Sequence, residues 1–152
     1  MKYAALLVSL LTMFANTSIC SATDINDPFA NLKRFENKNP YEVLQDKSLR
    51  RLIKQITKKH FIDLENYLNV SSGVKVDSDG ALDGDGCMPH VCSINEAKIY
   101  ITRAGEIYIA ILKNADKLMY FTNDKNNLYT IVSPIKEYVE NFPNVTILYM
   151  SK

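Results

Sequence analysis

Cysteine is scarce in this sequence, with three residues among 152, and the charges almost cancel, with a formal net charge of +1. A chain with balanced charge has no general attraction to nucleic acid or to an anionic membrane surface. Outside the N-terminus there is no run of about 20 apolar residues, so no transmembrane helix is predicted. Internal repeats and low-complexity tracts are also missing, which favours one compact globular domain.

The first 22 residues are typical of a cleaved secretory signal. Lys2 supplies an early positive charge, an apolar run covers residues 4–15, and Cys20 and Ala22 place small side chains just before the predicted cleavage point. A run of about a dozen apolar residues is too short to span a bilayer of about 30 Å. Lipidation at Cys20 is disfavoured, because Ile19 stands where a small residue is needed. We therefore predict export from the cytoplasm to an oxidising compartment.

Cleavage leaves a mature chain of residues 23–152, which we treat as a single domain, with Cys87 and Cys92 as its only cysteines. In an oxidising compartment these two should be bonded to each other. Closing a ring of about six residues contributes about 2 kcal/mol in the chain-entropy model. The disulfide is therefore expected to shape a loop more than to stabilise the fold, because a chain of this length buries enough apolar surface to fold without further cross-links.

The residues favour a protein that is neither an enzyme nor a metal carrier. G-x-S-x-G, a phosphate-binding loop and a metal-ligating helix motif are all missing, and an oxidised cysteine pair cannot act as a nucleophile. Zinc held by Cys87, His90 and Cys92 would need a fourth ligand, and the only other histidine, His60, lies on a helix. A calcium loop starting at Asp77 would lack its third and twelfth ligands. No cofactor is predicted.

Hydrophobic periodicity predicts helices first and strands afterwards. Residues 48–68, "SLRRLIKQITKKHFIDLENYL", repeat apolar side chains at three- and four-residue spacing, which indicates one amphipathic helix with Ser48 as N-cap and a solvated basic face. A weaker helical signal at 27–45 is broken by Pro40. The segment 133–142 is predicted to be a short helix, with Ser133 as N-cap, Pro134 at the first helical position and Glu137 as capping-box partner.

The strand signals begin at Gly73, where the apolar period changes to two. Strand candidates are residues 73–80, 96–102, 106–113, 117–123, 128–132 and 145–151. Hairpin-sized connections, "RAG" and "NAD", separate three of them. Ile99, Ile101, Ile107, Ile109 and Ile111 alternate onto one side of their strands. The prediction is an α+β fold in which an antiparallel meander of about five strands carries helices on one face.

The heptapeptide "GCMPHVC", residues 86–92, resembles the C-x-P-H-x-C loop of the Ivy family, periplasmic inhibitors of vertebrate c-type lysozyme. The resemblance implies a central antiparallel sheet with helices on one side and a disulfide-closed loop that enters the lysozyme cleft. By position, Pro89 would stiffen this loop and His90 would bond the enzyme's catalytic carboxylates, while Met88 and Val91 hold variable positions. The implied inhibitory loop is Cys87, Met88, Pro89, His90, Val91 and Cys92.

The chemistry of this loop is reasonable for a glycosidase inhibitor. A retaining glycosidase keeps two carboxyl groups about 5 Å apart, and the two ring nitrogens of one imidazole can hydrogen-bond both of them. Asp83 and Asp85, just before the loop, would steer a basic lysozyme toward it.

Other interpretations of the loop stay open at this point. His90 can be an ordinary loop histidine beside a structural disulfide. The protein can also be a periplasmic binding or envelope protein whose loop recognises another partner, such as a lytic transglycosylase or a related muramidase. The sequence does not decide between a monomer and a homodimer.

Overall fold

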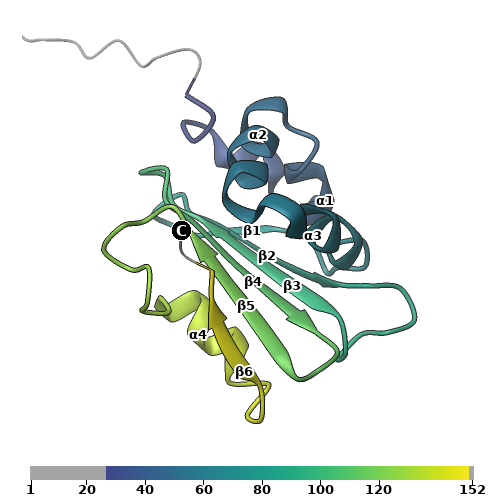
Figure 1. Cartoon of the computed structure of the whole chain (residues 1–152). Helices are drawn as coiled ribbons and strands as arrows, with labels where there is room; N and C mark the ends of the chain where they lie inside the picture. Colours follow the sequence, from purple (N-terminus) through teal and green to yellow (C-terminus); the bar gives the residue numbers. More distant parts are fainter. Residues whose placement is uncertain (1–26, 151–152) are drawn as a thin grey trace, which may run out of the picture.

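A computed structural model describes residues 27–150, so the predicted signal segment and Cys20 lie outside the described residues. Most helices precede the sheet, as the sequence predicts (Figure 1). The elements are η1 (Leu32–Phe35), α1 (Pro40–Val43), α2 (Lys47–Thr57), η2 (Lys58–His60), α3 (Phe61–Tyr67), β1 (Lys75–Val76), β2 (Leu82–Cys87), β3 (Glu96–Ile101), β4 (Ile107–Lys113), β5 (Lys117–Thr122), α4 (Ser133–Val139) and β6 (Thr146–Tyr149), where η marks a 3₁₀-helix.

The strands form one six-stranded sheet in the order β1-β2-β3-β4-β5-β6, which confirms the α+β class. Neighbouring strands are antiparallel except β5 and β6, which are parallel because α4 crosses over between them. The predicted strand at 128–132 is wrong: these residues form part of the connection from β5 to α4. Both edges of β5 are already paired, one with β4 and one with β6, so this segment finds no free edge there.

Helices cover both faces of the sheet (Figure 1). The helices α2 and α3 bury their apolar residues against the face that carries the alternating isoleucines of β3 and β4, as predicted. The prediction of helices on one face alone is wrong for α4, whose Ile135 and Tyr138 pack with Tyr108 and Tyr120 on the opposite face. The reason is visible in β4, where six consecutive residues are buried, so neither face of this strand can be left to solvent.

The predicted single helix at 48–68 is two helices joined by a 3₁₀ turn. The chain leaves the α-helical conformation at Lys58, whose φ is +52°. A short 3₁₀ turn keeps the apolar side chains at nearly helical spacing, so the periodicity of the sequence gives no sign of the break. Beyond it, α3 buries Phe61, Leu64 and Tyr67 in the same core.

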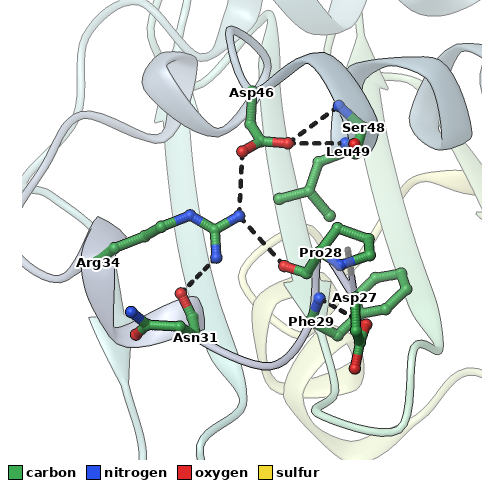
Figure 2. Close-up of polar contacts among 8 residues, drawn as sticks. All are labelled: Asp27, Pro28, Phe29, Asn31, Arg34, Asp46, Ser48 and Leu49. Atoms are coloured by element: carbon green, nitrogen blue, oxygen red, sulfur yellow. Dashed lines mark hydrogen bonds and ion pairs between the residues drawn. The ribbon is translucent and has the colours of Figure 1, made fainter. Parts of the chain in front are cut away.

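The N-cap of α2 is Asp46 rather than the predicted Ser48. Asp46 Oδ1 accepts the amides of Ser48 (3.1 Å) and Leu49 (3.0 Å), while Oδ2 accepts Arg34 Nη2 at 3.0 Å (Figure 2). Arg34 also donates to the carbonyls of Asn31 and Pro28, which ties the N-terminal segment to the helix. Partial burial opposes ionisation of Asp46, but the bonds from the Leu49 amide and from Arg34 lower its pKa below the usual value.

The start of α4 also differs from the prediction. Its N-cap is Val132, and no side chain caps the helix. Ser133 is already helical, and its hydroxyl lies 3.3 Å from Glu137 Oε1, four residues further on. Ser133 and Glu137 are therefore a pair of neighbours on the helix surface and not a capping box, whereas Pro134 lies in the first turn as expected.

Candidate inhibitory loop

The backbone at Val70 crosses close to β2, the strand that leads into the loop. Val70 pairs with Cys87 through two backbone hydrogen bonds, of 3.1 and 2.9 Å. A Cβ on Gly86 would lie 2.9 Å from the carbonyl oxygen of Val70 and 3.0 Å from Leu68 Cα, so this crossing needs glycine at position 86. Gly86 thus allows the backbones of β2 and of the segment at Val70 to approach each other. Cys87, the next residue, is held from both sides, by Val70 and by Glu96 of β3.

Cys87 and Cys92 are bonded to each other, as the sequence predicts, with their Cα atoms 5.0 Å apart. Within the ring, the amide of Val91 donates to the carbonyl of Met88 at 3.1 Å, which closes a four-residue turn. Pro89 occupies the second position of this turn and His90 the third, where φ is +67°. Proline second and a positive φ third are typical of a type II turn.

His90 therefore occupies a backbone conformation that glycine usually takes. Histidine is one of the few other residues enriched in the left-handed region, although the conformation still costs of the order of 1 kcal/mol. Strained positions of this kind persist where the surroundings hold them, and they are frequent at ligand-binding sites. Here the disulfide and the turn bond supply that constraint.

The tip of the loop is open to solvent. Met88, Pro89 and His90 are all exposed, and Val91 is half-buried. Among residues 27–150, no side chain forms a hydrogen bond, ion pair or ring contact with the imidazole of His90. The imidazole is therefore exposed, with both nitrogens available to a partner, and the β2–β3 loop projects beyond the sheet at the end where β4 turns into β5 (Figure 1).

The aspartates that precede the loop have different roles. Asp83 forms an ion pair with the buried Lys98 of the neighbouring strand. Asp85 is exposed, and it has no ion pair within the described part of the chain. Asp77 is at the opposite end of β2, where its Oδ1 accepts the amides of Asp79 (2.9 Å) and Ala81 (2.8 Å) and closes the β1–β2 turn. Of the two predicted steering residues, only Asp85 offers an uncompensated charge.

The second histidine is a packing residue. His60 is partly buried, its ring lies 5.7 Å from that of Phe121, and its Nδ1 is 3.5 Å from Asp63 Oδ2. Asp63 also pairs with Lys113 of β4 at 3.2 Å. This interaction joins α3 to the sheet, far along the chain from the loop.

Two candidate functional residues at the C-terminal base of the loop were not predicted from the sequence. Asn95 Oδ1 accepts the amide of Asn114 in the β4–β5 turn at 3.0 Å, and Glu96 Oε1 accepts the amide of Ser93 at 2.5 Å. Nothing in a single sequence distinguishes these side chains from other polar residues before a strand. The partner of Asn95 becomes visible only when the β4–β5 turn is placed beside the loop.

The family model described as "Inhibitor of vertebrate lysozyme (Ivy)" matches residues 48–145, which is more than half of the chain. The protein belongs to the Ivy family. The match runs from α2 to the segment just before β6, and it confirms the family that the resemblance indicates. This protein is therefore a lysozyme inhibitor and not an enzyme.

No curated protein and no solved structure matches the chain. Within residues 27–150, no helix has the length and apolar character needed to cross a membrane. In the same residues, no three side chains of histidine, cysteine, aspartate or glutamate are grouped so that they could hold a metal ion.

Proposed function

We propose that this Ivy-family protein blocks c-type lysozyme by inserting the Cys87–Cys92 loop into the catalytic cleft, where His90 hydrogen-bonds the two catalytic carboxyl groups. The observation that carries the proposal is the position of His90. It lies at the tip of a ring closed by a disulfide and a turn bond, exposed and without a partner among the described residues. A residue displayed in one conformation loses little entropy on binding.

The imidazole suits the geometry of a retaining glycosidase. Its two nitrogens point in different directions, so one ring can bond two carboxyl groups that lie about 5 Å apart. One of those carboxyl groups is protonated and the other ionised in the resting enzyme, and an imidazole can be a donor to one and an acceptor from the other. A lysine would bring charge without this two-sided arrangement.

The residues around His90 complete the contact. Met88 within the loop is 38% exposed and Ile94 just after it is 45% exposed, so apolar surface is available close to His90 along the chain. Burial of these side chains would exclude water from the bonds that His90 forms. The exposed carboxylate of Asp85 would raise the rate of association with a strongly basic lysozyme at low salt, since Asp83 is already paired with Lys98.

The site of action follows from the compartment. The signal-like residues 1–22 and the disulfide between Cys87 and Cys92 both agree with export to the oxidising periplasm of a Gram-negative bacterium. Lysozyme that passes the outer membrane would meet the inhibitor there, beside the peptidoglycan it attacks. This placement makes evasion of a host defence the biological role.

The experiment is lysis of a peptidoglycan suspension by c-type lysozyme in the presence of purified residues 23–152. We expect inhibition by the wild type and an inhibition constant at least about thirtyfold higher for His90→Ala, because central interface residues are commonly worth about 2 kcal/mol or more. The unfolding free energy of the variant should change by less than about 0.5 kcal/mol, since the side chain is exposed.

Asp79→Ala, which removes an exposed side chain from the turn at the far end of β2, is the matched control and should inhibit as the wild type does. Equal inhibition by wild type and His90→Ala would refute the role of His90. Inhibition of a bacterial lytic transglycosylase, with none of c-type lysozyme, would refute the proposed target.

A further inference from the structure

The disulfide fixes the shape of the ring but not its orientation on the molecule. The ring leaves the sheet at Cys87, which is held between Val70 and Glu96. It returns through residues 93–95, which lie outside the disulfide-closed segment. Two backbone bonds join the ring to this segment, from the amide of Met88 to the carbonyl of Asn95 (3.0 Å) and from the amide of Asn95 to the carbonyl of Val91 (3.1 Å). The orientation of the ring, and with it the place of His90, therefore depends on how the returning segment is itself held.

Two side chains hold this returning segment. Glu96 Oε1 accepts the amide of Ser93 at 2.5 Å, and Ser93 has a φ of +68°, a conformation that a serine seldom adopts without support. Asn95 Oδ1 accepts the amide of Asn114, at 3.0 Å, from the turn between β4 and β5. The first bond lies within the loop, whereas the second joins the loop to a neighbouring hairpin.

The surrounding contacts make this attachment firm. The amide of Ala115 donates to the carbonyl of Ile94 at 2.9 Å, so the β4–β5 turn bonds the loop twice. On the other side, the hydroxyl of Tyr138 in α4 lies 3.5 Å from Glu96 Oε2. Burial and the nearby Glu96 raise the pKa of Tyr138 far above its usual value, which keeps the phenol a proton donor. Glu96 thus connects Ser93 to α4.

We infer that Asn95 and Glu96 are positioning residues of the inhibitor, whose side chains fix the orientation of the Cys87–Cys92 loop and hence the place of His90. The inference rests on the proposed function, because it concerns the delivery of His90 to the lysozyme cleft. Neither side chain is at the tip of the loop. Each acts through the segment that it holds, and Asn95 Nδ2 also lies 4.0 Å from Met88 Sδ in the loop.

A double-mutant cycle in the lysis assay tests this inference. Asn95→Ala and Glu96→Ala should each raise the inhibition constant about tenfold, the effect of losing one well-formed hydrogen bond that restrains the loop. In a His90→Ala background the same substitutions should change the residual inhibition by less than about twofold, because they act through His90. Asn95→Asp and Glu96→Gln retain an acceptor oxygen and should restore inhibition to within about threefold of the wild type. Asn126→Ala, exposed at the opposite end of the sheet, is the control.

Amide hydrogen exchange on the free inhibitor separates this inference from the proposed function. Exchange at Ser93 should accelerate about tenfold in Glu96→Ala, and exchange at Asn114 should accelerate about tenfold in Asn95→Ala. Unchanged exchange at both amides overturns the inference even if His90→Ala abolishes inhibition. Full additivity with His90→Ala overturns it as well. Accelerated exchange together with unimpaired inhibition by His90→Ala supports the restraint on the loop and refutes the proposed role of His90 instead.

Discussion

The two ends of the sheet use their polar side chains differently. At the end away from the loop, Asp77, Asn123 and Asp124 bond the backbone or side chains of their own turns and of neighbouring strands. At the loop end, the side chains of Asn95 and Glu96 bond only the base of the loop, a disulfide and a backbone bond close its ring, and the imidazole of His90 is left without a partner among the described residues. A polar group that stabilises a turn is occupied, whereas a covalently closed loop keeps its tip free to bind.

This difference predicts that substitutions at the two ends have opposite consequences. Changes at the far end should lower the free energy of unfolding and leave inhibition intact. Changes at the loop tip should weaken inhibition and leave the fold intact. Changes to residues that close the loop should weaken inhibition and also lower the free energy of unfolding.

The largest effect in this comparison should come from opening the ring. Cys87→Ala combined with Cys92→Ala removes the covalent closure, so the turn that carries His90 samples many conformations before binding. We expect the inhibition constant to rise about thirtyfold and the unfolding free energy to fall by about 2 kcal/mol. Lysis assays and urea unfolding measure the two quantities. Unchanged inhibition would show that the backbone bonds alone hold the tip.

A smaller effect, on stability only, is expected at the far end of β2. Asp77→Ala removes the carboxylate that accepts the amides of Asp79 and Ala81, which should lower the unfolding free energy by about 1–2 kcal/mol. The inhibition constant should stay within about twofold of the wild type. Asp79→Ala serves as control, since its side chain is exposed. Loss of inhibition in Asp77→Ala, with the fold intact, would contradict the claim that changes at the far end affect stability alone.

The smallest effect concerns acid stability. Hydrogen bonds from Asn127, from the Tyr108 hydroxyl and from the Asn126 amide lower the pKa of the buried Asp124 below its usual value. A carboxyl with a lowered pKa stabilises the fold above the unfolded value, near pH 4, and this contribution is lost as the pH falls through the folded value. Between pH 5 and pH 3 the wild type should therefore lose more stability than Asp124→Asn.

Urea unfolding at the two pH values checks the role of Asp124. Asp46, whose pKa is also lowered, remains in both proteins and contributes equally to their acid slopes. Parallel slopes for wild type and Asp124→Asn would mean that Asp124 contributes nothing to the acid dependence.

Much of the fold could be predicted because its signals are local. The alternation at Ile99, Ile101, Ile107 and Ile109 correctly placed two central strands and their buried face. The break at Lys58 could not be predicted, because the apolar spacing continues through the 3₁₀ turn. The placement of α4 on the second face depends on the parallel crossover from β5 to β6, which no short stretch of sequence encodes.

The loop itself was recognisable because its cysteines, proline and histidine stand at fixed spacing within six residues. Its support was not, since Val70 and Asn114 are brought to the loop by tertiary structure. Gly86 illustrates the same limit: the sequence shows a glycine, and only the fold shows the backbone of Val70 that requires it.

The most direct test of the central claim is competition for the lysozyme cleft. The binding constant of wild-type inhibitor for c-type lysozyme should be measured by calorimetry with and without a saturating chitin trisaccharide, which occupies the substrate cleft. If the Cys87–Cys92 loop fills that cleft, the apparent Kd should rise by a factor of one plus the ratio of the trisaccharide concentration to the dissociation constant of the trisaccharide. An unchanged Kd, with both ligands bound at once, would contradict the account.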